Sequence, residues 1–131
     1  MITPYPKPPK SKKKNRKGVW DRVRTTVVKP MFQALGVTYC EVTKYEFERG
    51  NITKAQALKR NYNLSFHHRH KRDFYKQFKN ERELLGNLDQ VLLVGQYYHD
   101  ILEADKEATE AYFMRFRGKE KLPIDTQSCL L

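Results

Sequence analysis

The histidines of this chain are grouped in a way that indicates metal chemistry. His67, His68 and His70 lie within four residues of one another, and His99 precedes Glu103 by four residues. On a helix, residues four apart share a face, so the His99 imidazole and the Glu103 carboxylate can reach the same cation. Taken alone, this pair is more typical of a helix surface. Together with the histidine cluster, it predicts a site for one divalent ion, and Mg2+, Mn2+, Ni2+ and Zn2+ are not distinguished by ligand type alone.

Three segments resemble the HNH (ββα-metal) endonuclease family, particularly its compact phage-type members. Residues 39–43 (YCEVT) are similar to the Cys-Glu-x-Cys knuckle that opens the family motif, and residues 64–72 (LSFHHRHKR) to its first strand and catalytic histidine. Residues 89–100 (DQVLLVGQYYHD) resemble its second strand and the start of its metal-binding helix. The resemblance covers residues 39–103, half of the chain, and implies an α+β fold in which flanking helices surround a hairpin-plus-helix unit.

The resemblance also implies a role for each residue of the motif. His68 would be the general base, because a neutral imidazole with an ordinary pKa of about 6.5 can take a proton from water near pH 7. His67 and His99 would hold the metal ion, with Glu103 as the third ligand. The ion would stabilise the leaving 3′ oxygen while the activated water attacks a phosphodiester of DNA.

The middle residue of the motif has two candidates. Gln90 has the expected spacing from His99, and Asn87 is the alternative; either amide could hydrogen-bond backbone groups and hold the base in place. His70 is interpreted as a phosphate contact or a plain loop residue. A shift in register that would make His70 the catalytic histidine is a further alternative.

Many family members also contain a structural zinc held by two Cys-x-x-Cys pairs. Here those positions carry Cys40 with Thr43 and Gly95 with Tyr98, so no four-cysteine zinc site is expected. Cys40 should instead be a buried core residue. Either a hydrophobic core has replaced the zinc and activity is retained, or the chain is an inactive relative that binds nucleic acid without cutting it.

The charge of the chain favours a polyanionic partner. Lys and Arg outnumber Asp and Glu by 26 to 15, for a net charge of +11 and a pI near 9.7. Residues 1–18 form a Pro-rich arm with seven basic side chains and no acidic one, and residues 19–131 form the HNH-like domain. The arm is expected to be a disordered tether for duplex or branched DNA; a solubilising tail or a localisation signal is the alternative.

The predicted nucleic-acid contacts are Lys12, Lys13, Lys14, Arg16 and Lys17 in the arm, and Arg69, His70, Lys71, Arg72 and Lys76 in the domain. Phe74, Tyr75 and Phe78, between these basic residues, are expected to be a core stripe.

Periodicity and turn residues predict the elements that position these groups. A helix is expected over residues 20–35, bent near Pro30 and ending at Gly36, followed by a strand or knuckle over 37–43. Thr53 and Gln56 indicate a capping box for a helix over 53–60. Strands are expected at 63–68 and 91–94, a loop with some helix at 69–87, and a helix over 99–117 that ends at Gly118. No function is assigned to residues 44–62.

Three competing functions follow from these observations: the nuclease, an inactive DNA- or RNA-binding accessory protein with a phage or host protein partner, and a small basic structural protein that contacts RNA. No apolar run approaches the roughly 20 residues that would span a bilayer, so no membrane partner is expected. The sequence lacks the apolar core of a signal peptide and has two cysteines. Both features favour the cytoplasm, or a host cytoplasm if the protein is viral.

Overall fold

The computed structural model describes residues 18–122; the predicted contacts Lys12, Lys13, Lys14, Arg16 and Lys17 therefore lie outside the described residues, as does most of the arm. The first helical run comprises α2 (Val19–Val23), the π-helical turn η1 (Arg24–Val28) and α3 (Lys29–Leu35). The wide turn comes immediately before Pro30, which has no N–H to donate and whose ring would crowd a regular preceding turn. As predicted, the run ends at Gly36, whose φ of 76° is readily adopted by glycine.

Residues 37–43, predicted as a strand or knuckle, instead lead into a helix. α4 spans Glu41–Glu48, and Cys40 is its N-cap, with Sγ accepting a hydrogen bond from the Thr43 N–H at 3.3 Å. Cys40 is fully buried, as expected of a core residue. The capping box of Thr53 and Gln56 is present and begins α5 (Lys54–Arg60) where the sequence predicted a helix.

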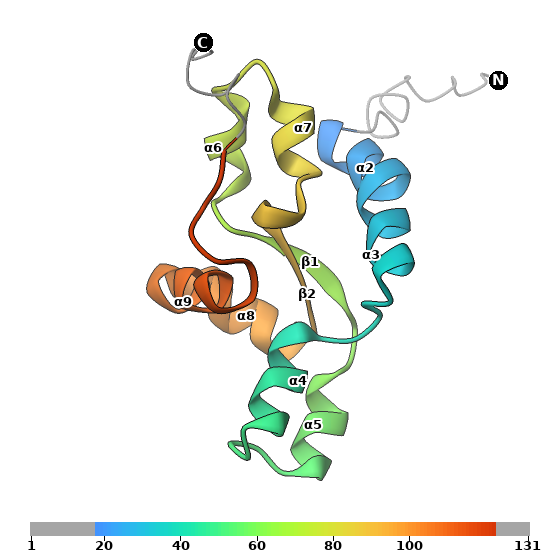
Figure 1. Ribbon diagram of the computed structural model, residues 1–131, viewed down its shortest axis with the longest axis vertical. Coiled ribbons are helices and arrows are strands. Elements are labelled where there is room, and N and C mark those ends of the chain that lie inside the picture. The colour runs from blue at the N-terminus through green and yellow to red at the C-terminus, as the bar shows by residue number, and fades with distance from the viewer. Residues whose placement is uncertain (1–17, 123–131) are drawn as a thin grey trace, which may run out of the picture.

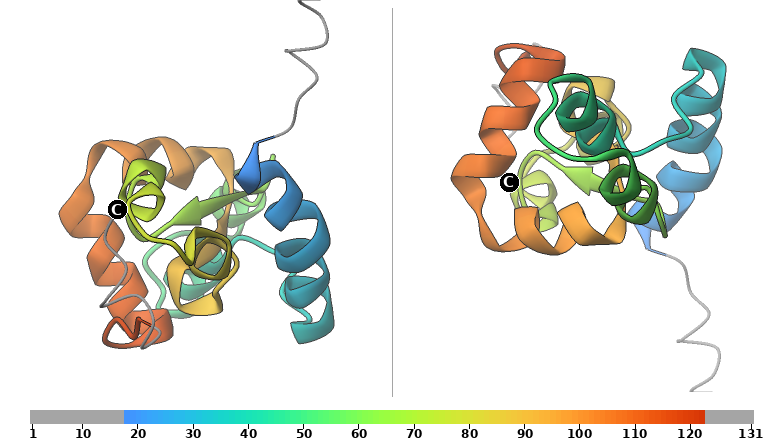
Figure 2. Two further views of the ribbon diagram at one scale, coloured as in Figure 1. Left: turned by 90° about the horizontal axis from the view of Figure 1, so that it is seen from above. Right: turned by 90° about the horizontal axis from the view of Figure 1, so that it is seen from below.

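The two predicted strands form a two-stranded antiparallel sheet, so the predicted α+β class is confirmed. β1 (Ser65–His68) pairs with β2 (Val91–Val94), with Ser65 opposite Val94 and His68 opposite Val91. Helices cover both faces of this sheet: α2 and α3 on one, α8 and α9 on the other (Figures 1 and 2).

Burial of both faces explains the continuous apolar sequence of β2. Successive strand residues point to opposite faces, so Val91 and Leu93 join the core beside α2 and α3, and Leu92 and Val94 join the core beside α8 and α9. Paired residues of an antiparallel sheet share a face. His68 therefore lies on the face of Val91, and its neighbour His67 lies on the opposite face, beside α8 and α9.

The helix predicted over residues 99–117 is two helices, so its predicted continuity is wrong. α8 spans Gln96–Ala104 and α9 spans Lys106–Arg117. Asp105 between them has an extended backbone (φ −130°, ψ 97°), and its Oδ1 accepts the Ala108 N–H at 2.9 Å, as an N-cap does. α9 ends before Gly118, as predicted.

The predicted loop with some helix over residues 69–87 contains α6 (Arg72–Lys76) and α7 (Glu81–Leu85), followed by the short 3-10 turn η2 (Leu88–Gln90). Tyr75 is fully buried, and Phe74 and Phe78 pack against the same core as part-buried side chains. The interpretation of these aromatic residues as a core stripe is therefore confirmed.

A part-buried ion pair joins elements that are far apart in sequence. Arg117 at the end of α9 donates both terminal N–H groups to the Glu41 carboxylate at 2.9 Å, and Glu41 Oε2 also accepts the Leu93 N–H at 2.9 Å. Arg117 further donates to the carbonyls of Leu88 and Val91. This network fastens α4 and α9 to β2 at the segment where the resemblance would place the zinc knuckle. Within the part of the chain described, no helix is both long enough and apolar enough to cross a membrane.

Candidate metal centre

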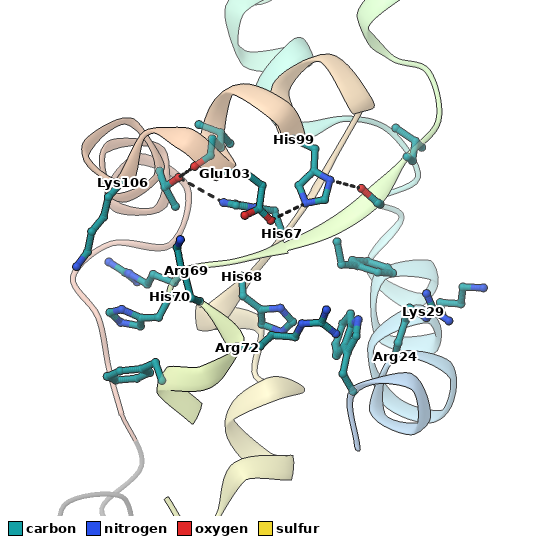
Figure 3. Close-up of a pocket in the computed structure, with 18 residues that line it drawn as sticks. Arg24, Lys29, His67, His68, Arg69, His70, Arg72, His99, Glu103 and Lys106 are labelled. Carbon is teal, nitrogen blue, oxygen red and sulfur yellow. Dashed lines mark hydrogen bonds and ion pairs between the residues drawn. The ribbon is translucent and has the colours of Figure 1, made fainter. Parts of the chain in front are cut away.

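The three residues predicted as metal ligands converge in the structure. His67 projects from β1, and His99 and Glu103 stand one turn apart on α8, facing it (Figure 3). One potential ligand atom from each of the three residues lies within 4.8 Å of the other two. Glu103 Oε1 is 3.2 Å from His99 Nε2 and 3.9 Å from His67 Nδ1. Two imidazoles and a carboxylate suit a divalent transition metal and would leave coordination positions for water or substrate.

Each imidazole of this cluster uses its other ring nitrogen for a hydroxyl group. His67 Nε2 lies 3.3 Å from Thr109 Oγ1 on α9, and His99 Nδ1 lies 3.2 Å from Ser65 Oγ on β1. Such outer contacts hold a metal-binding imidazole in one orientation. Sequence spacing did not indicate Ser65 or Thr109, because both are brought to the histidines only by the packing of α8 and α9 on the sheet.

Burial keeps the imidazole of His67 neutral. The pKa of His67 is lowered to about 4, chiefly by burial and then by the neighbouring His99, while the Glu103 carboxylate acts in the opposite direction. Neutral imidazole is the form that binds a metal ion. The His67 side chain is 7% exposed and that of Glu103 is 57% exposed, so the centre is closed at the strand and open to solvent at Glu103.

His68, predicted as the general base, lies on the opposite face of β1. Its Nε2 is 3.0 Å from the carbonyl oxygen of Leu85, and its ring packs edge-on against Trp20 with 4.5 Å between ring centroids. A carbonyl can only accept, so Nε2 carries the proton and Nδ1 has a free lone pair. The pKa of His68 is lowered to about 4, first by burial and also by Arg72, while the Leu85 hydrogen bond acts in the opposite direction.

Neither candidate for the middle residue of the motif has a hydrogen bond to His68. The Gln90 side chain is buried, accepts from the Tyr75 hydroxyl at 2.7 Å and donates to Glu120 at 2.7 Å. Asn87 Oδ1 accepts the Asp89 N–H and begins η2. The group that hydrogen-bonds His68 is the Leu85 backbone carbonyl, two residues before Asn87, and a backbone group has no side-chain signature in a sequence.

One pocket of about 820 Å³ is lined by both His67 and His68, although the two side chains lie on opposite faces of β1. His67, His99 and Glu103 line one part of it and His68 another, along β1 (Figure 3). Trp20 is also part of the pocket wall. Four exposed basic residues also line it and make no ion pair within residues 18–122: Lys29, Lys71, Arg72 and Lys106.

The remaining predicted contacts differ from these four. His70 lines the pocket but its Nε2 lies 2.7 Å from Glu120 Oε2, and its ring stacks on Phe74. Lys76 pairs with Asp73 at 3.3 Å and is not part of the pocket wall. Lys71 and Arg72 are thus the predicted contacts of the domain that remain exposed at the pocket with no acidic partner among the described residues.

Arg69 was predicted as a phosphate contact, and the structure corrects this. Its side chain is 0% exposed and donates to both oxygens of Glu110 at 3.0 and 2.8 Å and to the Gly118 carbonyl at 2.9 Å. Asp89 lies 3.5 Å away on the other side. The hydrogen bond from Arg69 lowers the pKa of Glu110 below its ordinary value. Arg69 is therefore a structural residue that joins the end of β1 to α9. The carboxylates of Asp89 and Glu110 are distant in the sequence, and the fold places them beside it.

Replacing Arg69 with methionine should therefore lower the free energy of unfolding by about 3 kcal/mol. The substitution leaves the carboxylates of Asp89 and Glu110 without the cation that pairs with them. Arg72→Met, at the exposed neighbouring site, should change it by no more than about 0.5 kcal/mol. Urea unfolding followed by circular dichroism measures both values. Equal stabilities of the two variants would show that Arg69 contributes no more than a surface arginine.

Comparison of the chain with protein-family models, curated proteins and solved structures finds no match.

Proposed function

We propose that this protein is a metal-dependent endonuclease of the HNH type that hydrolyses phosphodiester bonds of DNA. The observation that carries the proposal is the meeting of four residues, singled out by type and spacing, in one pocket. His67, His99 and Glu103 form the ligand cluster, and His68, adjacent in sequence, presents an unprotonated nitrogen from the other face of the same strand.

In this proposal His68 accepts the proton of the attacking water at Nδ1. Its Nε2–H is held by the Leu85 carbonyl at 3.0 Å, so the ring has one orientation and one tautomer before substrate arrives. A phosphate bound beside the ring favours the imidazolium that forms, since a nearby negative charge stabilises the protonated state. When bound at His67, His99 and Glu103, a divalent ion would polarise the phosphate and stabilise charge on the leaving 3′ oxygen.

The basic residues of the pocket supply the sequence-independent part of DNA binding. Lys29 comes from α3, Lys71 and Arg72 from the segment after β1, and Lys106 from the start of α9, so cations of three separate elements border the cluster. These cations have no acidic partner among the described residues, so they can pair with phosphate groups of DNA. Each such pair releases counterions that were condensed on the DNA. The seven basic residues of the arm precede α2, whose Trp20 lines the same pocket.

The proposal predicts metal-dependent cleavage of supercoiled plasmid. We expect nicking or linearisation by the wild-type protein with at least one of Mg2+, Mn2+, Ni2+ and Zn2+, none with a chelator, and a loss of at least about 100-fold in His99→Ala, since the ion supplies several kcal/mol of charge stabilisation in the transition state. Asp100→Ala removes an exposed group from α8 outside the cluster and should cleave like the wild type.

The same gel distinguishes the competing functions. A plasmid that shifts in mobility but stays intact with every metal would contradict the nuclease and support a DNA-binding module without activity. A preference for RNA over duplex DNA, without cleavage of either, would support the RNA-contacting structural protein.

A further inference from the structure

We infer that Thr109 is a positioning residue that presents Nδ1 of His67 to a metal ion. The inference rests on the proposed metal centre and deepens it, since Thr109 lies on α9 and is outside the ligand set. Thr109 is 3% exposed, and its Oγ1 lies 3.3 Å from His67 Nε2.

The direction of this hydrogen bond follows from the other partners of the hydroxyl. Thr109 Oγ1 lies 2.8 Å from the carbonyl oxygen of Leu102 and 3.0 Å from that of Asp105. Both carbonyls can only accept, so the single hydroxyl proton is directed to them. The oxygen is then an acceptor for His67, and the ring proton of His67 must be on Nε2. The lone pair of Nδ1 is left facing Glu103 and His99 in the form that binds a metal ion.

The hydrogen bonds of the second imidazole, His99, do not fix its tautomer in this way. Ser65 Oγ has one described side-chain partner, His99 Nδ1 at 3.2 Å, and a freely rotating hydroxyl can donate to that nitrogen or accept from it. His99 Nε2 in turn lies 3.2 Å from Glu103 Oε1, a carboxylate oxygen that can accept a hydrogen bond from Nε2–H. The tautomer of His99 can therefore change when an ion binds, and that of His67 is set beforehand.

The break between α8 and α9 is what brings Thr109 to His67. On one continuous helix, Thr109 would lie roughly 120° around the axis from Glu103 and about 9 Å further along it. The extended backbone at Asp105 redirects the chain, so that the first turn of α9 covers His67 while His99 and Glu103 reach the cluster from α8. The interruption thus has a role in assembling the proposed metal centre.

The test compares Thr109→Val with Thr109→Ser and with Thr43→Val. Valine keeps the shape of threonine and removes the hydroxyl, and the carbonyls of Leu102 and Asp105 retain backbone donors, Asp105 N–H and Thr109 N–H. Thr43 is a matched control, because it is also buried, and its hydroxyl has no hydrogen-bond partner among residues 18–122. Thermal unfolding of each variant shows whether the domain is folded before any binding is measured.

Two readouts separate positioning from a merely structural role. In metal-free protein, 15N chemical shifts of His67 should show the Nε2–H tautomer in the wild type and in Thr109→Ser, and a mixture of tautomers in Thr109→Val. By calorimetry with Zn2+ and Mn2+, Thr109→Val should bind about 10- to 100-fold more weakly than the wild type, with Thr109→Ser and Thr43→Val close to the wild type.

Each contrary result has its own meaning. If the wild type binds ions and Thr109→Val binds them equally well, the role of Thr109 is overturned and the metal centre stands. If wild-type His67 carries its proton on Nδ1, the role of Thr109 is also overturned. If the wild type binds none of the ions tested, the proposed metal centre fails, and the inference fails with it.

Discussion

Replacing His68 with glutamine should reduce plasmid cleavage by about 10²- to 10⁴-fold, the contribution of a positioned general base, with metal affinity unchanged. Glutamine can still donate an N–H toward the Leu85 carbonyl and fills much of the same volume, but it has no nitrogen that can accept a proton from water. His68→Ala should lose as much activity and also some stability, because it leaves the buried space beside Trp20 empty.

The separation of the two histidines makes this prediction specific. His67 and His68 are adjacent in sequence but point to opposite faces of β1, and only His67 is part of the cluster with His99 and Glu103. His67→Ala should therefore lose metal binding and cleavage together, while His68→Gln loses cleavage alone. Calorimetry with Mn2+ beside the plasmid assay measures the difference. Full activity in His68→Gln would remove His68 from the mechanism.

The second large effect is on folding, and it occurs at Gly95. A Cβ at this position would lie 2.0 Å from the Arg60 carbonyl oxygen and 3.1 Å from that of Tyr62. Both obstacles are backbone atoms, so no side-chain rotation can relieve the contact. Gly95→Ala should lower the free energy of unfolding by at least about 3 kcal/mol, more than a typical single substitution, and should displace α8 with the candidate ligands His99 and Glu103.

Gly18→Ala is the matched control, because a Cβ there meets no atom of the described residues within 4 Å and the residue also precedes a helix. Its cost should stay below about 1 kcal/mol, the difference expected between glycine and alanine as N-cap residues. Denaturant unfolding measures both values. A Gly95→Ala variant as stable as Gly18→Ala would mean that the chain at residues 60–62 moves aside without penalty.

Local patterns predicted most elements, and together with the resemblance they predicted the three side chains that converge in the candidate metal centre. The apolar run 91–94 with flanking polar residues indicated β2, and Thr53 with Gln56 indicated the start of α5, because strand burial and capping depend on neighbouring residues. The four-residue spacing of His99 and Glu103 likewise determines that they share a face of α8. These inferences needed only the geometry of one helix or one strand.

Predictions failed where distant parts of the chain decide the outcome. The apolar pattern of α8 continues into α9, so the break at Asp105 was missed; the aspartate caps a second helix that packs in a new direction. Residues 37–43 were similar to a zinc knuckle, but Cys40 caps a helix there and Glu41 pairs with Arg117, 76 residues further along the chain.

The basic run after β1 shows the same limit at the level of single residues. Arg69 and Arg72 are equivalent in composition and charge, yet Arg69 is buried between carboxylates of η2 and α9, and Arg72 stays exposed at the pocket. Sequence alone determined which residue types are available for metal, base and phosphate chemistry, because type and spacing are local properties. Tertiary structure alone decided that Leu85 and Thr109 hydrogen-bond to the histidines and that Arg69 is buried between carboxylates, because hydrogen bonds and ion pairs form between the groups that the packing of helices on the sheet brings together.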